Sequence, residues 1–485
     1  MHSVTVSIDT SGEEVLNEKY CCNATLKASV LLTILIPFYF LLDPPLINAL
    51  FPMLLAGICL SALFSLRRIA LSQVILLPIA WFLLACVTYY GIGPLLYVYG
   101  NDVSLASVQF FYYVDDKALW RTNLLNIVSI ALMLYFFSLG MGLPLFRPFK
   151  RFGDSATLKR CGNVFSFLGV VFTLITYNLR SSLGMDFLMP GIFYTLAKCS
   201  YSGLLLYSLL YFSKQREVRI PLFMMAGFVG YFALTSFMKQ NILEFIAMLF
   251  FGAFLAKPSI RKLLIAACLI IVTLPALNTL TTYGRILVWT ESSTQASAID
   301  LIKAASDSDE IIDNFKEATE GNQGIWKRIS QAASQAFAMD AYDNGKPGNS
   351  FEPALWAFVP RLIYPDKPVV TQGEAFTTLV RGEPIGGGNG AGFFGEAYWN
   401  FGWLGVFLVS IFTGVLLAGL TKFNNNMAST RNYQYFPVAF MALSIGYGID
   451  GWFVSATLNS IPLMIFLYIM IKLITERIHV FVRYI

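Results

Sequence analysis

The feature that most constrains this chain is a succession of apolar segments, each about as long as a bilayer is thick. A hydrocarbon core of about 30 Å takes about 20 helical residues, and twelve segments of this kind can be marked along the 485 residues. Because a backbone inside lipid must satisfy its own hydrogen bonds, each segment is expected to be a helix. They are expected near residues 27–42, 46–66, 73–95, 124–145, 163–178, 192–212, 220–238, 241–256, 262–281, 396–420, 434–450 and 454–474.

The proportion of charged residues places the chain in a membrane. Charged side chains make up 13% of it and hydrophobic ones 56%, whereas soluble proteins carry about 25% charged residues. We therefore predict an all-α polytopic integral membrane protein. Its basic residues fall in short clusters between apolar segments, which excludes nucleic acid as a partner. The two histidines, His2 and His479, lie near the ends, which excludes an interior histidine base or a histidine-ligated metal.

Lysine and arginine recur in every second connection between the apolar segments, for example at Arg67, Arg216 and Lys257. Cytoplasmic loops of membrane proteins carry such an excess, so we expect twelve spans with both termini in the cytoplasm. The acidic, polar N-terminus lacks the pattern of a signal peptide. The expected order is a cytoplasmic tail at 1–26, nine spans over 27–281, a large loop at 282–395, three spans over 396–474 and a cytoplasmic tail at 475–485.

The same alternation places the loop at 282–395 on the extracytoplasmic face. A connection of this length is uncommon unless it is functional or disordered, and its Trp and Phe residues favour a folded cap. Apolar residues between Ile325 and Phe337 recur near helical spacing, which predicts a short amphipathic helix ending at Asn344 and Gly345. None of the seven cysteines lies in this loop, so no disulfide framework is expected there.

The loop contains the stretch FVPRLIYPDKPVV, in which three prolines flank Arg361 and Lys367. A rigid segment that presents two cations suits a fixed anion such as a pyrophosphate, because arginine can bind oxygens bidentately. The alternative is a solvated turn in which the prolines only interrupt helices.

A glycine-rich stretch, RGEPIGGGNGAGFFGEAYWNFGWLGV, leads from the loop into the next span at residues 381–406. No Lys-Ser/Thr pair follows its last glycine, and ATP is absent from the outer face, so it is not read as a phosphate-binding P-loop. The glycines allow positive φ and close approach to a ligand. Glu396 begins the following helix, whose dipole favours the ionised carboxylate, and Asn400 lies one turn later on the same face. Helix capping is the alternative role for Glu396.

Isolated charges near or within the apolar segments form a further group of candidates. Arg180 and Arg285 follow spans on the outer face, where they either serve a site or extend to lipid head groups. Glu244 and Asp450 are intramembrane acids. Such acids are functional candidates, and the alternative is a hydrogen bond between packed helices.

These residues resemble a known family. A many-span topology with one large outer loop late in the chain is similar to bacterial O-antigen and exopolysaccharide repeat-unit polymerases of the Wzy type, which are GT-C-like glycosyltransferases. The local sequence resembles theirs in PRLIYPDKP, in the glycine-rich stretch that follows and in GEAYWNFGWLGV. The resemblance covers the topology of the whole chain and the local sequence from about residue 323 to residue 406. O-antigen ligases are the relatives most easily confused with this family.

The resemblance implies a function in lipopolysaccharide or exopolysaccharide biosynthesis. Such an enzyme transfers a glycan from undecaprenyl pyrophosphate to a new lipid-linked repeat unit, at the periplasmic face of the bacterial inner membrane. It uses no nucleotide sugar, no metal and no other cofactor. Its partners are the lipid-linked oligosaccharide donor and acceptor, membrane lipid and a chain-length regulator protein. The competing readings are a ligase, a polysaccharide transporter or flippase in which Glu244 couples ions, and a non-catalytic partner of an export complex.

The resemblance also assigns roles to residues. Some related ligases use a loop histidine as a possible base, and this loop has none, so either a carboxylate serves or the acceptor needs no strong base. The base chosen here is Glu396, with Glu383 and Asp366 as substitutes. The other candidates divide into two groups. Five basic residues would bind the pyrophosphate, namely Arg361, Lys367, Arg381, Arg285 and Arg180, and three residues would bind the glycan, namely Asn400, Tyr398 and Trp399.

Overall fold

The computed structural model describes a chain built from helices. The described residues are 10–101, 105, 112–145, 149, 154–183, 191–236, 238–266, 268–269, 329–352, 356, 359, 364, 372–382 and 390–483. In these ranges every regular element is a helix. The α-helices are α1 (Thr10–Leu35), α2 (Pro44–Ser65), α3 (Leu71–Val74), α4 (Pro78–Ala85), α5 (Gly93–Tyr99), α7 (Asp116–Met141), α8 (Ser155–Leu183), α9 (Gly191–Phe212), α10 (Arg219–Thr235), α11 (Lys239–Ala256), α16 (Ala332–Asp343), α17 (Gln372–Arg381), α18 (Gly392–Ser429), α19 (Phe436–Tyr447) and α20 (Ser460–Arg483).

Shorter helical turns join several of these helices. Two are π-helices, η3 (Cys86–Ile92) between α4 and α5 and η7 (Val454–Leu458) before α20. Four are 3-10 turns, namely η1 (Ile36–Phe40), η2 (Leu66–Arg68), η4 (Arg216–Val218) and η6 (Tyr433–Tyr435).

Nine helices of the described part are long and apolar enough to cross a membrane, which supports the predicted polytopic membrane protein. They are Val15–Phe40, Pro44–Arg68, Pro78–Tyr99, Asp116–Met141, Ser155–Leu179, Arg216–Thr235, Lys239–Ala256, Gly392–Ser429 and Val454–Thr475. Each coincides with one of the twelve expected segments. Matching helix length to bilayer thickness therefore located most of the long helices.

The other three expected segments have different outcomes. The segment at 192–212 forms α9 but is not among the nine, because polar side chains such as Lys198 and Ser200 lower its hydropathy. The segment at 434–450 forms α19, which has only 12 residues. Most of the segment at 262–281 lies outside the described residues. At the N-terminus, α1 begins at Thr10, inside the stretch expected as a tail.

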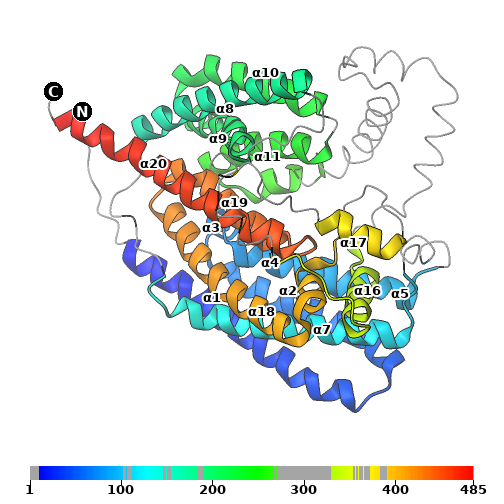
Figure 1. Ribbon diagram of the computed structural model, residues 1–485. Helices are drawn as coiled ribbons and strands as arrows, with labels where there is room; N and C mark the ends of the chain where they lie inside the picture. The colour runs from blue at the N-terminus through cyan, green and yellow to red at the C-terminus, as the bar shows by residue number, and fades with distance from the viewer. Residues whose placement is uncertain are drawn as a thin grey trace.

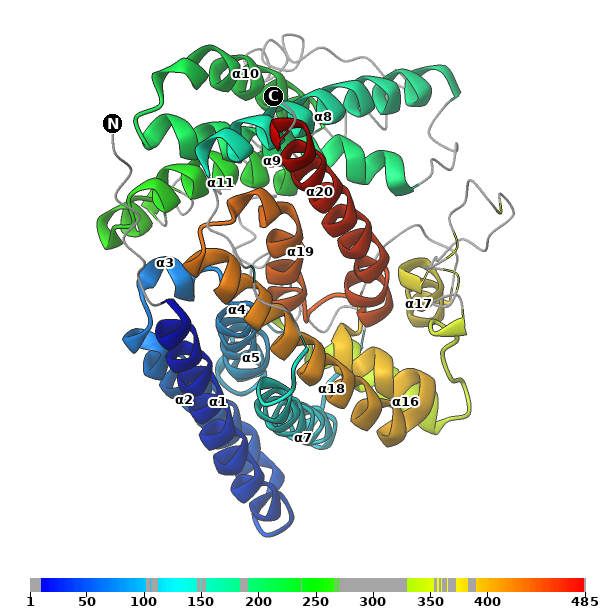
Figure 2. The ribbon, with the colours of Figure 1, turned by 90° about the vertical axis from the view of Figure 1, so that its left-hand side faces the viewer.

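The helices gather into two groups (Figures 1 and 2). One group consists of α8, α9, α10 and α11, in which α9 contacts each of the other three. The second group contains α1 to α7 together with α16 to α20, and α18 runs through it in contact with α1, α4, α7, α16 and α19. The candidate residues at the start of α18 therefore belong to the second group.

Helices α7 and α18 approach closely because small residues line their interface. A Cβ on Gly414 of α18 would lie 2.5 Å from the carbonyl oxygen of Met133 on α7, and one on Gly140 would lie 2.8 Å from Cβ of Ala418. Small residues at such contacts let membrane helices pack backbone to backbone. This packing fixes the part of α18 around residues 414–418 relative to α7. At its N-terminal end, α7 is capped by Asp115, whose side chain accepts from the amide of Ala118 at 2.7 Å.

Helix α18 is interrupted near its start by a kink at Phe401 and Gly402. Gly402 has φ +59° and ψ −147°, a combination that is essentially restricted to glycine. A Cβ there would also lie 2.8 Å from the ring of Tyr342. The kink separates the first turns of α18, which carry Glu396 and Asn400, from the long membrane-crossing part of the helix.

The described part of the large loop lies over the start of α18. Helix α16 contacts both α7 and α18, and it ends at Asn344 and Gly345 with φ +74° at the glycine. The predicted amphipathic helix and its end are confirmed there. Aromatic contacts also join α17 to the start of α18, since Phe376 contacts the rings of Trp399 and Trp452.

Candidate functional site

Four of the sequence-predicted site residues have described side chains, and all four lie in the first turns of α18: Glu396, Tyr398, Trp399 and Asn400. The other candidates belong to less fully described parts of the chain. Only the backbone is described for Arg180, in α8, and for Arg381, at the end of α17. Arg285, Arg361, Asp366, Lys367 and Glu383 lie outside the described residues. Their roles stay predictions.

Glu396 is a fully buried carboxylate held from two sides. Its exposed fraction is 0%. The hydroxyl of Ser350 donates to Oε1 at 2.6 Å, and the amide of Val454, the first residue of η7, donates to Oε2 at 3.3 Å. Hydrogen bonds to both oxygens compensate part of the cost of burying this group. The carboxylate thus joins the loop, α18 and the start of η7 at one point.

Asn400 lies against the same serine, as its spacing of four residues from Glu396 predicts. Its Nδ2 donates to Ser350 Oγ at 2.8 Å and to the carbonyl oxygen of Glu396 at 2.8 Å. Its Oδ1 is buried and has no hydrogen-bond partner among the described residues. A buried acceptor left unpaired costs about 1–3 kcal/mol, so a ligand that donated to this atom would recover part of that cost.

Tyr398 and Trp399 hold the loop against α18. The hydroxyl of Tyr398 donates to Asp343 at 3.1 Å, and Nε1 of Trp399 donates to the carbonyl of Lys346 at 3.1 Å. Their residues are 6% and 5% exposed. In this arrangement a glycan would reach either ring only after the loop moved, and their role in glycan binding stays a prediction.

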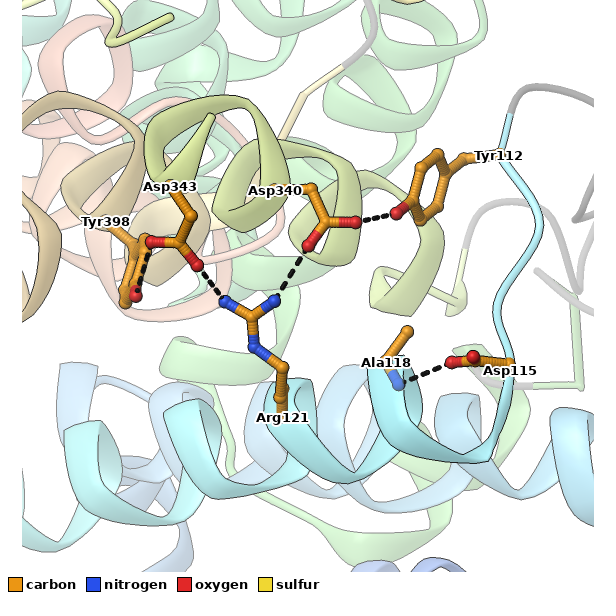
Figure 3. Close-up of polar contacts among 7 residues, drawn as sticks. All are labelled: Tyr112, Asp115, Ala118, Arg121, Asp340, Asp343 and Tyr398. Carbon is orange, nitrogen blue, oxygen red and sulfur yellow. Dashed lines mark hydrogen bonds and ion pairs between the residues drawn. The ribbon is translucent and has the colours of Figure 1, made fainter. Parts of the chain in front are cut away.

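An arginine that the sequence reasoning did not select joins three helices of this region (Figure 3). Arg121, on α7, pairs with both Asp340 and Asp343 of α16, and its Nη1 lies 2.7 Å from Oδ1 of Asp340. Tyr112 donates to Asp340 and Tyr398 donates to Asp343. One guanidinium therefore fastens α16 to α7 and, through Tyr398, to α18.

Two carboxylates around one guanidinium leave a net negative charge in this Arg121 cluster. Burial, together with the charge of Asp343, raises the pKa of Asp340. Two sequence signals pointed to the cluster. Asp340 and Asp343 are three residues apart on a predicted helix and so share a face. Arg121 is a basic residue at the end of a span that the charge alternation of the sequence is expected to place on the extracytoplasmic side, against the usual bias.

Glu244, the acid in the middle of a predicted span, has a packing explanation. Nζ of Lys198 on α9 lies 3.3 Å from Oε1 of Glu244 on α11, and Nε2 of Gln240 donates to the same oxygen at 2.8 Å. The pair links two helices of the first group. Asp450, in contrast, lies in the turn between α19 and η7. Among the residues that the structure describes, no group of three acids, cysteines or histidines is placed to hold a metal ion.

An apolar groove of about 960 Å³ runs along α18 below this region. Helices α18, α19 and α20 line it, and its lining includes Leu408, Phe412, Leu416, Phe423, Met464 and Tyr468. The ring of Phe412 lies 6.0 Å from that of Phe453, the residue before Val454. The groove therefore begins one aromatic side chain away from the buried carboxylate.

The geometry combines a buried carboxylate, an amide with an unused acceptor, a covering loop and an apolar groove. Such a combination can deprotonate a hydroxyl and can accommodate a hydrocarbon chain beside it. Comparison with protein-family models, with curated proteins and with solved structures found no match for this chain.

Proposed function

We propose that this chain is a membrane glycosyltransferase that polymerises undecaprenyl-pyrophosphate-linked oligosaccharide repeat units into a surface polysaccharide. The observation that carries the proposal is the buried carboxylate of Glu396, which lies under the loop, with Phe453 between it and the apolar groove. A substrate with a polar head and a hydrocarbon tail needs both surroundings in one place.

The groove has a length that suits a lipid tail. Its lining on α18 extends from Leu408 to Phe423, and at 1.5 Å per residue these positions span roughly 22 Å of helix. That is a large part of a hydrocarbon core of about 30 Å. A tail in the groove would leave its polar head near Phe453 and Glu396.

The proposed reaction needs a base and a way to stabilise the leaving group. Glu396, or else Glu383 or Asp366, accepts the proton of the acceptor hydroxyl. The acceptor oxygen forms a bond to the anomeric carbon of the donor, while the bond from that carbon to the pyrophosphate breaks and its electron pair goes to the pyrophosphate. The five basic candidates named in the sequence would stabilise this charge.

The proposal includes the membrane arrangement expected from the sequence. Twelve spans with both termini in the cytoplasm put the loop at 282–395 and the start of α18 on the periplasmic face of the inner membrane. Lipid-linked repeat units would reach the site there without any nucleotide, and a chain-length regulator would act as a partner.

The test is glycan elongation by purified protein. We expect the protein, in liposomes with lipid-linked repeat units and no nucleotide, to convert single units into longer lipid-linked glycans. Transfer that requires an added lipopolysaccharide core would instead identify a ligase. No transfer to either acceptor, by protein shown to be folded, would overturn the proposal.

A further inference from the structure

Ser350 makes two hydrogen bonds that match those of an alcohol held for deprotonation. Its hydroxyl donates to Oε1 of Glu396 at 2.6 Å and accepts from Nδ2 of Asn400 at 2.8 Å. A general base has to lie within about 2.6–3.2 Å of the oxygen whose proton it removes. The serine side chain thus occupies the position at which a ligand hydroxyl would meet the carboxylate.

Ser350 does not use everything that this position offers. A serine hydroxyl has a single proton to donate, and here that proton is directed to Glu396. The buried Oδ1 of Asn400 consequently accepts nothing from the described residues. A ligand with several hydroxyl groups could donate to both oxygens, which points to a polyhydroxylated compound such as a sugar.

The serine lies at the end of a short segment that follows α16. We call residues 344–350 the strap, because they leave α16 and pass over the start of α18. Its second residue, Gly345, has φ +74°. Two neutral hydrogen bonds join it to Trp399, whose Nε1 donates to the Lys346 carbonyl at 3.1 Å and whose carbonyl accepts from the amide of Gly348 at 2.9 Å.

The strap is held to α18 by these two bonds to Trp399 and by the bonds of Ser350 to Glu396 and Asn400. A ligand hydroxyl that takes the place of Ser350 makes the same bonds to Glu396 and Asn400 in its stead. The two neutral bonds to Trp399, at about 0.5–1.5 kcal/mol each, are then the ones to be broken. Helix α16 is held separately, by Arg121 and its two carboxylates, so the strap can lift while α16 stays in place, with Gly345 at the point of bending.

We propose that Glu396 and Asn400 bind the acceptor hydroxyl, and that Ser350 occupies their site until a sugar displaces the strap. The proposal rests on the proposed function and specifies how the acceptor is recognised. The acceptor hydroxyl then donates to Oε1 of Glu396 and accepts from Nδ2 of Asn400, as Ser350 does here. During transfer its proton moves to Glu396 while its oxygen replaces the pyrophosphate oxygen on the anomeric carbon.

The first test asks whether the strap opens, and it does not depend on turnover. In protein whose seven native cysteines are replaced, Ser350→Cys and Ser330→Cys are compared for reaction with a membrane-impermeant maleimide. Both serines are buried, at 2% and 8% exposed. We expect Ser350→Cys to react about tenfold faster than the control, as for a segment that opens on the μs–ms scale, and faster still with lipid-linked repeat units. Equal labelling rates for the two variants without ligand would overturn the proposal that the strap opens.

The second test separates a displaced serine from a merely structural one. Ser350→Ala removes the competing hydroxyl, so we expect KM for the acceptor to fall by about threefold to tenfold with little change in kcat, because a ground-state competitor is lost. Ser330→Ala should leave both constants unchanged. A lower kcat at unchanged KM in Ser350→Ala would overturn the proposal. If the wild type makes no polymer, the proposed function fails, and the labelling rates without ligand still decide whether the strap moves.

Discussion

The two ends of α18 bury polar groups of different kinds. At the start of the helix a carboxyl group, that of Glu396, is buried beside Asn400 and Ser350. At the other end the buried polar groups are neutral amides. There Nδ2 of Asn424 donates to the carbonyls of Leu76 at 2.8 Å and Ala439 at 3.2 Å.

The amides at the C-terminal end of α18, which we call the amide end, belong to a hydrogen-bond network that extends to other helices. Asn17 of α1 donates to Gln73 at 2.9 Å and to Asn425 at 3.3 Å, and Asn426 accepts from the amide of Phe149 at 2.7 Å. Neutral amides can link helices without the desolvation cost that a buried charge carries. The comparison suggests that a buried carboxylate is not needed to hold such helices together, so its presence at the start of α18 calls for a chemical reason.

The largest effect on stability is expected when a carboxyl group replaces the amide at the C-terminal end of α18. Asn424→Asp places a carboxylate where no cation or strong donor compensates it, and we expect a loss of about 3–5 kcal/mol in the free energy of unfolding. Glu396→Gln replaces a buried carboxyl group by a neutral amide of nearly the same shape and should change stability by less than about 1 kcal/mol. Chemical denaturation in detergent measures both. Equal losses in the two variants would show that the ends do not differ.

A smaller effect is expected at the kink that separates the two ends. Gly402→Ala forces an alanine into a conformation restricted to glycine and towards the ring of Tyr342, which should cost about 1–3 kcal/mol. Gly227→Ala is the matched control, because Gly227 lies in α10 with open space around its Cβ position. That change should stabilise the helix by about 0.5–1 kcal/mol. Thermal unfolding distinguishes the opposite signs, and a neutral Gly402→Ala would contradict the role of the kink.

The Arg121 cluster should contribute somewhat less, because its groups are partly exposed. Arg121→Ala leaves Asp340 and Asp343 without a cation, and with their side chains 36% and 42% exposed we expect a loss of about 1–2 kcal/mol. Limited proteolysis should then cut the loop near α16 faster. The control, Arg67→Ala, changes an exposed arginine and should have no effect. An unchanged cutting rate in Arg121→Ala would show that this residue does not hold α16.

The smallest effect concerns pH. Burial and Asp343 raise the pKa of Asp340, so the folded state favours its protonated form. The resulting contribution is fully present below the unfolded pKa of about 3.9, and it is lost as the pH rises through the folded value. As the pH rises from the unfolded to the folded pKa of Asp340, we expect the melting temperature of the wild type to increase less than that of Asp340→Asn. Asp43→Asn, at an exposed site, is the control and should follow the wild type. If the melting temperatures of Asp340→Asn and the wild type change by the same amount with pH, the prediction is contradicted.

The difference between the ends also shows what a sequence can predict here. The long helices follow from the length of the apolar segments, the end of α16 from Asn344 and Gly345, and the alignment of Glu396 with Asn400 from their spacing, because each depends on neighbouring residues. The contacts that complete the site join distant ones. Ser350 and Glu396 are 46 residues apart and Arg121 and Asp340 are 219 apart, so only the packing of α7, α16 and α18 reveals them.

The most direct test of the whole account compares turnover at the two ends. Glycan elongation per folded molecule is measured for purified wild type, Glu396→Gln and Asn424→Ala with the same lipid-linked repeat units. If the carboxylate is the general base and the amide end is structural, Glu396→Gln should lose about 10²–10⁴-fold in kcat, while Asn424→Ala, though less stable, keeps the wild-type value. Wild-type turnover in Glu396→Gln, or an equal loss in both variants, would contradict the account.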